Sequence, residues 1–275
     1  MLARITLLTL LFTTLGCGPG RTTFARYPAS APAFDRAASD PKALEIADRV
    51  LAAAGGQDKW NAAKQIRWSV SVTTGKASPP VTFEEAWDRW NGRHYNRLHS
   101  AAGDVVVMRS LYEAGGTAFG EVGHNRQTIG TADSERAMTN ARERWALDTT
   151  TLFLPFLLEA PGTKLELVGE AAGEAGQPPL DELKVTFDPK DPTRTSTYHV
   201  MVNRGTNQIE RIEIVKAGDP DSKRLGYHVA TWVDAGGMKL GTVYQNIGFA
   251  DEVITFSGLA VAAEADEALF VPVVQ

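Results

Sequence analysis

Apolar and polar residues alternate along several short segments of the chain. Ile66, Trp68, Val70 and Val72 are separated by polar residues, and the same period of two recurs within residues 81–87, 183–187, 198–202, 212–214 and 243–249. Successive side chains of a strand point to opposite faces, so this period is typical of strands with one buried and one solvent-facing side. The pattern predicts an antiparallel sheet as the main body of the protein.

Turn sequences lie between these segments at the spacing of hairpins. They are Gly115-Gly116, Arg204-Gly205-Thr206 and Gly236-Gly237. Such connections join antiparallel neighbours directly. With no repeat of fixed period and no second linker in the chain, we expect all of the strands in one domain.

A helix is predicted just before the first strand. Asp40 can accept hydrogen bonds from free backbone N–H groups, and Pro41 suits the first helical position. Apolar residues at helical spacing follow as far as Ala54, and Gly55-Gly56 is a typical end. Trp60 is expected in a further short helical turn.

A second helical pattern interrupts the strands between residues 133 and 158. Asp133 begins a stretch that runs through Trp145, and Asp148 is expected to cap a second piece ending near Leu158. The second piece is apolar on nearly every side and contains Pro155, which is expected to kink it. Such a helix is either buried on all faces or covers an apolar surface.

The N-terminus carries an apolar run, Ile5 to Leu15, after the single charge of Arg4. As a helix this run would rise only about 16 Å, roughly half of a bilayer core, which is typical of a signal peptide. The following Leu15-Gly16-Cys17 resembles a bacterial lipoprotein signal. The resemblance implies removal of residues 1–16 and acylation of Cys17, by a diacylglyceryl group and a further chain such as palmitate.

With Gly18 rather than an acidic residue after the cysteine, the same resemblance implies an anchor in the outer membrane, facing the periplasm. Residues 17–39 contain Pro19, Pro28 and Pro32 among small residues and are expected to form a flexible tether. Residues 40–275 are expected to form the globular domain.

The composition of the chain argues against several classes of function. The chain is 43% apolar and 22% charged with a net charge of −5, and its basic residues are scattered, which argues against nucleic-acid binding. One cysteine excludes a disulfide framework and a thiolate zinc site. The five histidines lack zinc-motif spacing, and no catalytic or nucleotide-binding motif is present. We therefore expect no metal, no cofactor and no enzymatic activity.

Glu85 is the one carboxylate on an apolar strand face. Pairing with Arg67 or Arg97 across strands is the simpler expectation, and a polar point inside a cavity is the alternative.

Three segments resemble the second half of the LolA/LolB-like superfamily of periplasmic lipoprotein carriers and receptors. They are residues 202–209, with a turn glycine and a following aliphatic residue; residues 232–240, a hairpin that begins with an aromatic residue; and Leu269-Phe270-Val271-Pro272. The order of helix, strands, helices, strands is similar as well. The resemblance implies an α+β fold, mainly antiparallel β, in which helices cover an incomplete barrel.

An incomplete barrel with aromatic residues inside can leave a cavity for an acyl chain or another apolar ligand. The candidate lining is Trp68, Phe83, Trp87, Phe153, Phe156 and Phe187. The alternative is that these side chains pack against one another as an ordinary core. The sequence thus predicts a monomeric envelope lipoprotein that binds or transfers a lipid or acyl ligand, or else a structural or interaction lipoprotein without a ligand.

Overall fold

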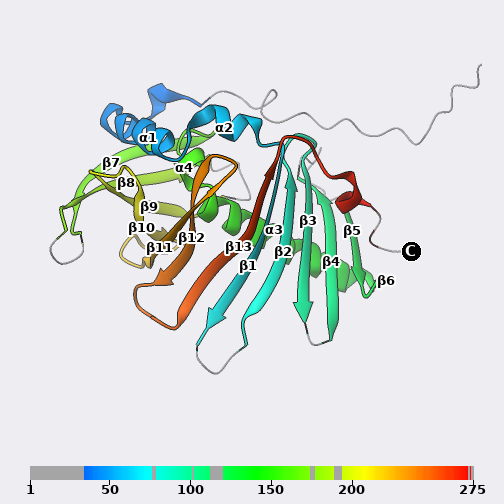
Figure 1. The fold of residues 1–275 in the computed structure, drawn as a ribbon. Helices are drawn as coiled ribbons and strands as arrows, with labels where there is room; N and C mark the ends of the chain where they lie inside the picture. Colours follow the sequence, from blue (N-terminus) through cyan, green and yellow to red (C-terminus); the bar gives the residue numbers. More distant parts are fainter. Residues whose placement is uncertain are drawn as a thin grey trace, which may run out of the picture.

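An antiparallel sheet of 13 strands makes up most of the computed structural model (Figure 1). The structure describes residues 34–75, 79–100, 102–111, 120–173, 177–188, 194–271 and 273. Along the sheet the strand order is β6-β5-β4-β3-β2-β1-β13-β12-β11-β10-β9-β8-β7, which does not close into a barrel. The predicted fold class, an incomplete antiparallel barrel covered by helices, is confirmed.

The strands are β1 (Gln65–Thr74), β2 (Val81–Asp88), β3 (Arg93–Ser100), β4 (Gly103–Ser110), β5 (Gly120–His124), β6 (Gln127–Thr128), β7 (Thr163–Ala171), β8 (Leu180–Phe187), β9 (Thr197–Asn203), β10 (Ile209–Val215), β11 (Leu225–Ala235), β12 (Met238–Asn246) and β13 (Glu252–Ala262). The helices are α1 (Pro41–Ala53), α2 (Gly56–Ala62), α3 (Thr131–Leu152) and α4 (Leu154–Leu157), with the 3-10 turns η1 (Arg36–Ala38) and η2 (Glu267–Phe270). Every helix of the described residues is too short or too polar to cross a membrane.

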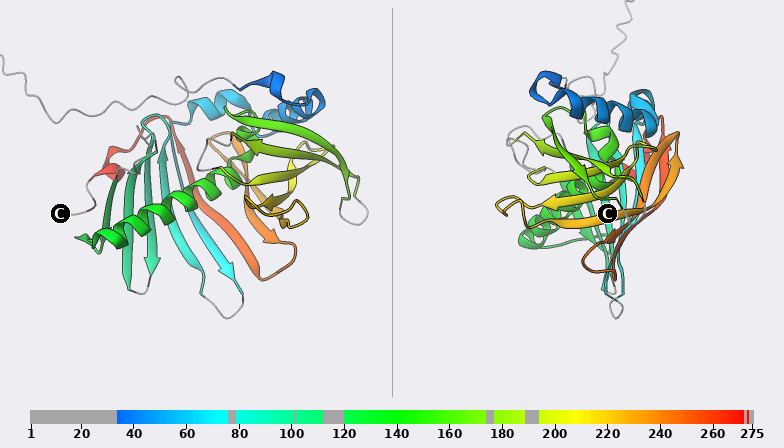
Figure 2. Two further views of the ribbon diagram at one scale, coloured as in Figure 1. Left: turned by 180° about the vertical axis from the view of Figure 1, so that it is seen from behind. Right: turned by 90° about the vertical axis from the view of Figure 1, so that its left-hand side faces the viewer.

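The first and the last strand meet in the middle of the sheet. β1 pairs with β2 on one side and with β13 on the other, and all other neighbours follow one another along the chain. The two outermost strands, β6 and β7, are connected by α3 and α4. Figure 2 shows α3 lying diagonally across one face of the sheet, while α1 and α2 lie along one rim. The face beneath α3 is called the inner face below, and the opposite one the outer face.

The first helix follows its sequence signals. The side chain of Asp40 accepts hydrogen bonds from the N–H groups of Lys42 and Ala43, and Pro41 is the first helical residue. α1 ends before Gly55, whose φ of +113° is a conformation that favours glycine. Trp60 lies in α2, as predicted.

The second helical region differs from the prediction. α3 is one continuous helix of 22 residues that includes Asp148, so this residue is a fully buried part of the helix and caps nothing. The break comes at Phe153 because Pro155 has no N–H to donate to the carbonyl of Thr151. That carbonyl instead accepts a hydrogen bond from the hydroxyl of Tyr244, at 3.0 Å.

The predicted boundary between tether and body also needs correction. Residues 34–39, assigned to the tether, pack on the body through η1. Ser39 is buried, its hydroxyl accepts the N–H of Leu165 at 3.0 Å, and Arg36 pairs with Asp48 and Glu159. The predicted signal peptide, Cys17 and the first part of the tether lie outside the described residues, as does Gly115-Gly116.

Candidate functional site

A cavity of about 210 Å³ lies on the inner face, between the N-terminal half of α3 and strands β2, β3 and β4. Ala137 and Ala141 are four residues apart on α3 and therefore point in the same direction, toward the sheet. Their small side chains leave room between helix and sheet. The lining consists of Phe83, Asn96, Leu98, Val105, Val107, Ile129, Asp133, Arg136, Ala137, Asn140 and Ala141.

The wall of this cavity is almost entirely apolar on the side of the sheet. Phe83, Leu98, Val105 and Val107 supply it from three neighbouring strands, at cross-strand positions of one face. Polar groups gather at the helix, where Arg136 pairs with Asp133 at 3.3 Å and both side chains are largely exposed. The site can therefore surround an apolar ligand, with polar groups at its edge.

Aromatic rings from α2, from the region of α4 and from strands β1 and β2 pack against one another on the inner face. Trp60 stacks on Phe156 with a centroid separation of 5.0 Å and lies 5.4 Å from Phe153. Phe153 also contacts Trp68 and Trp87, at 5.8 and 6.1 Å. All five rings are buried and belong to the main core. We call them the aromatic cluster.

The six predicted lining residues therefore fall into three places. Trp68, Trp87, Phe153 and Phe156 form the aromatic cluster together with Trp60, which the sequence did not single out as a lining residue. Phe83 lines the cavity beneath α3. Phe187 lies at the other end of the sheet, where it contacts Tyr198 at 5.9 Å. A ligand contact for any of them stays a prediction.

A buried polar network adjoins the cavity. Glu85 is 2% exposed and pairs with His94, and its second oxygen accepts a hydrogen bond from the amide of Asn96. Arg109 in turn donates from Nε to Nδ1 of His94, at 3.1 Å. The expectation that Glu85 pairs with Arg67 or Arg97 is wrong. They point to the outer face, whereas His94 and Asn96 share the inner face with Glu85.

The ring of His94 is neutral in this network. Its Nδ1 accepts from Arg109, so the proton is on Nε2 and is donated to Glu85. Burial holds the pKa of His94 below its usual value, and Arg109 acts in the same direction against Glu85. With both ring nitrogens engaged, His94 has no free position from which to act as a general base on a bound ligand.

α3 adds a second buried pair above this network. Arg144 pairs with Asp148 one turn further along the helix. Burial lowers the pKa of Arg144 to about 10, although the nearby Glu85 and Tyr227 raise it. Within the described residues no cluster of three metal-ligating side chains occurs. The buried charges of this region are thus paired within α3, close to the carboxylate of Glu85 on the sheet.

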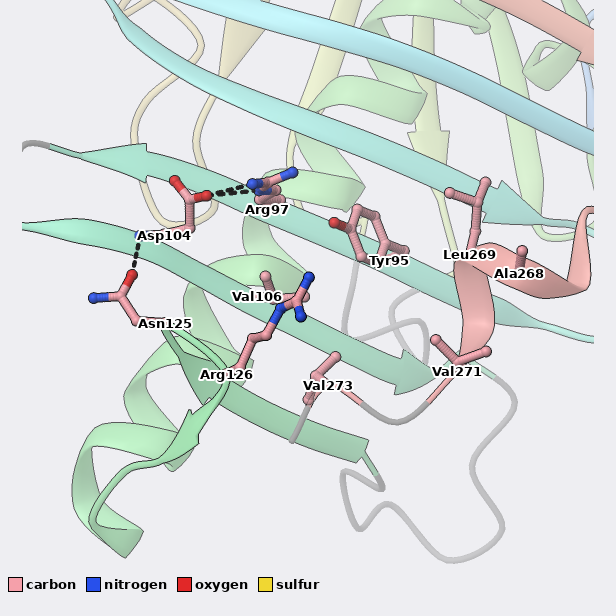
Figure 3. A pocket seen from close by; sticks show the side chains of 10 residues that line it. All are labelled: Tyr95, Arg97, Asp104, Val106, Asn125, Arg126, Ala268, Leu269, Val271 and Val273. Carbon is pink, nitrogen blue, oxygen red and sulfur yellow. Dashed lines mark hydrogen bonds and ion pairs between the residues drawn. The ribbon is translucent and has the colours of Figure 1, made fainter. Parts of the chain in front are cut away.

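A second hollow lies on the outer face, over β3 and β4 and beside η2 (Figure 3). It has a volume of about 460 Å³. Its lining residues are Tyr95, Arg97, Asp104, Val106, Asn125, Arg126, Ala268, Leu269, Val271 and Val273. We call it the outer groove. It is separated from the inner cavity by the sheet, because Tyr95 and Arg97 alternate with His94 and Asn96 along β3.

Comparison with known proteins gives fold similarity only at low sequence identity. No protein-family model matches the chain, and no curated protein matches it. A solved DUF1329 family protein from Desulfovibrio piger is similar over 85% of this chain and 98% of its own, with 12% identity and a TM-score of 0.48. The LolA superfamily protein NE2245 from Nitrosomonas europaea is similar over 83% and 97%, with 10% identity and a TM-score of 0.46. A LolA superfamily protein is thus among the structures similar to this chain.

Proposed function

We propose that the protein binds one apolar chain, such as the acyl chain of a lipid, in the cavity beneath α3, and holds or passes on its ligand at the cell envelope. The observation that carries the proposal is a cavity lined by the apolar side chains of Phe83, Leu98, Val105 and Val107 on the sheet and by the small side chains of Ala137 and Ala141 on α3. Phe83, Leu98 and Val105 are only partly buried, and an apolar ligand that covers them is favoured because it removes their apolar surface from water.

The size of the cavity sets the size of the ligand. Its volume of about 210 Å³ is below the 300–1,000 Å³ that is common for small-molecule pockets, so it suits part of a single chain rather than a whole lipid. Each buried methylene contributes about 0.8 kcal/mol, which corresponds to about a fourfold gain in affinity. Affinity should therefore rise with chain length and level off once the cavity is full.

α3 is attached in a way that suits entry of a ligand. Its C-terminal end, at Leu152, is fully buried in the main core, next to the aromatic cluster. Its N-terminal half rests on the sheet through a separate small cluster, built around Val107, Val122 and Ala141. Movement of that half away from β4 and β5 would open the cavity without disturbing the main core.

The location rests on the sequence. Acylation of Cys17 would anchor the protein, and the residues between Cys17 and Phe34 would tether the body to the membrane surface. The outer membrane and its periplasmic side are the proposed site because Gly18 follows the cysteine. Acid hydrolysis of the purified membrane-bound protein, followed by fatty-acid analysis, tests the anchor, and a Cys17→Ala variant should release the protein in soluble form.

Binding is tested by matched tryptophan substitutions on α3. Ala137→Trp fills the cavity, whereas Ala132→Trp places the same side chain on an exposed position of the same helix. In a titration with a fluorescent acyl probe, we expect Ala137→Trp to lose binding and Ala132→Trp to bind like the parent. Equal binding by both variants would refute the cavity as the site.

The second candidate is a structural or interaction lipoprotein without a ligand. The aromatic cluster favours it, because these rings pack into the main core and leave their part of the inner face filled by the chain's own side chains. Native mass spectrometry separates the two. Copurifying lipid that Ala137→Trp displaces supports the first function, and a protein that emerges empty and binds no acyl probe supports the second.

A further inference from the structure

The outer groove contains an arginine in a backbone conformation that favours glycine. Asn125 and Arg126 form the two-residue turn between β5 and β6, closed by the pairing of His124 with Gln127. Their φ angles are +50° and +65°. Two-residue hairpin turns with two positive φ angles prefer Asn-Gly, and a side chain at the second position is strained. The sequence therefore holds a long cationic side chain where glycine would be more stable.

The side chain of Arg126 extends into the groove without an internal partner among the residues that the structure describes. Figure 3 shows its side chain extending from the turn across β4, on the side of the groove that holds Tyr95. In the described part of the chain, the guanidinium of Arg126 forms no ion pair and no hydrogen bond. Backbone strain retained without an internal contact points to a contact with something outside the chain.

The other two charged residues of the lining, Arg97 and Asp104, pair with each other, and the carboxylates of Glu84 and Glu121 lie beside the groove. Arg97 donates to Asp104 at 3.0 Å from Nε and lies 3.6 Å from Glu84. The carboxylate of Glu121, next to the lining, accepts the N–H of Val273 at 3.0 Å. Among the ten lining residues, Arg97 and Asp104 cancel, so Arg126 leaves one positive charge facing the groove.

Most of the uncharged residues that line the groove are apolar. Val106 lies on the sheet, and Leu269, Val271 and Val273 extend from the C-terminal segment. Val271 is 54% exposed, so its side chain is accessible to a ligand. Tyr95 adds a ring and a hydroxyl; burial raises its pKa, despite the opposing effect of Arg97, so the phenol is neutral and can donate. A volume of about 460 Å³, with a few polar groups among apolar side chains and one cation without an internal partner within the described ranges, matches the usual character of a ligand site.

We propose that the outer groove binds a single-chain amphiphile that carries one negative charge, with its anionic head on Arg126 and its chain along Val106, Leu269 and Val271. A carboxylate is the simplest such head, because it accepts two hydrogen bonds from a guanidinium. This site lies on the opposite face of the sheet from the cavity of the proposed function, and each can exist without the other.

Titration calorimetry of the full chain with three probes tests the ligand class. Dodecanoate, below its critical micelle concentration, supplies both the charge and the chain; dodecanol supplies the chain alone, and acetate the charge alone. We expect dodecanoate to bind most tightly at the outer groove and acetate not to bind measurably. Equal affinity for dodecanoate and dodecanol would overturn the role of the charge and with it the proposal.

The decisive variant is Arg126→Gly. It removes the cation and at the same time places the preferred residue in the turn, so we expect about a tenfold loss of dodecanoate affinity together with a higher melting temperature. Arg49→Ala, an exposed arginine on α1, is the matched control and should change neither affinity nor turn stability. Because Arg126→Gly is expected to raise the melting temperature, its loss of binding could not be explained by unfolding.

Two outcomes would overturn the proposal. If Arg126→Gly bound dodecanoate like the parent while Ala137→Trp abolished binding, the ligand would occupy the inner cavity, and only the proposed function would stand. If Arg126→Gly lowered the melting temperature, the arginine would be stabilising the turn itself. Conversely, dodecanoate binding that requires Arg126 but tolerates Ala137→Trp would support the outer groove even if the inner cavity proved empty.

Discussion

Replacement of Phe153 by alanine tests whether the aromatic cluster is a solid core or the wall of a cavity. Phe153 is fully buried at the break between α3 and α4, and its ring lies 5.4 to 6.1 Å from those of Trp60, Trp68 and Trp87. Truncation removes these contacts and leaves a void that rigid neighbouring rings cannot close.

We expect a loss of about 3–5 kcal/mol in the free energy of unfolding, the usual cost of Phe→Ala in a packed core. For a domain of this size, each kcal/mol lowers the melting temperature by about 2–4 °C, so the shift should be about 6–20 °C. Urea denaturation followed by tryptophan fluorescence measures the free energy, and calorimetry measures the melting temperature.

Phe249→Ala is the matched control, because Phe249 is 65% exposed and its truncation should change stability by no more than about 0.5 kcal/mol. A loss below about 1.5 kcal/mol for Phe153→Ala would refute the packing argument. It would mean that the ring already faces open space and has fewer contacts to lose.

Three further results are expected. Glu85→Ala leaves His94 and Asn96 buried without their shared acceptor and should lower the free energy of unfolding, measured by urea denaturation, by about 2–4 kcal/mol. The neighbouring Glu84 is more exposed, so Glu84→Ala should lower it by less than about 1 kcal/mol. Equal losses would contradict the network. Gly55→Ala would place a Cβ 2.2 Å from the carbonyl oxygen of Gly237 at a positive φ, so its melting temperature should fall further than that of Gly75→Ala, where φ is also positive but the space is open. Glu182 and Asp221 both contact His199 and Arg224. Burial opposes ionisation of Glu182, but these contacts lower the pKa of both carboxyls below the ordinary values of 4.5 and 3.8, so their stabilisation is complete above those values and is lost as the pH falls through the lower folded-state values. Glu182→Gln should therefore flatten the acid dependence of the urea midpoint, and an unchanged dependence would refute the assignment.

Local patterns in the sequence were sufficient for the helix at Pro41 and for the strands with one clearly apolar face. The Asp40 cap, the glycines after Ala54 and the alternation at Ile66 to Val72 act over a few residues, so their effect does not depend on the rest of the chain. Two helical pieces are present, but the predicted break at Asp148 was wrong: aspartate is a common N-cap residue, whereas here Asp148 lies inside α3 and pairs with Arg144, and the break comes at Phe153.

The strands on the β3–β6 side of the sheet were not predicted, and the reason is physical. β3 turns His94 and Asn96 toward the interior, so its buried face reads as polar. These residues are tolerated there only because Glu85 and Arg109, from neighbouring strands, complete their hydrogen bonds. A pattern of hydrophobic residues cannot reveal a strand whose inner face is satisfied by partners distant in sequence.

For the candidate sites too, some features follow from local sequence patterns and others depend on the tertiary structure. By itself the sequence determined that this chain builds an antiparallel sheet, supplies it with many aromatic residues and interrupts it with an apolar helix, because each of these follows from short-range periodicity. Only the tertiary structure decided that four of the six chosen aromatics pack against one another, that the open space lies instead beneath Ala137 and Ala141, and that Arg126 faces a second groove. Cavities arise where side chains from several elements fail to meet, and that depends on the placement of whole elements in space.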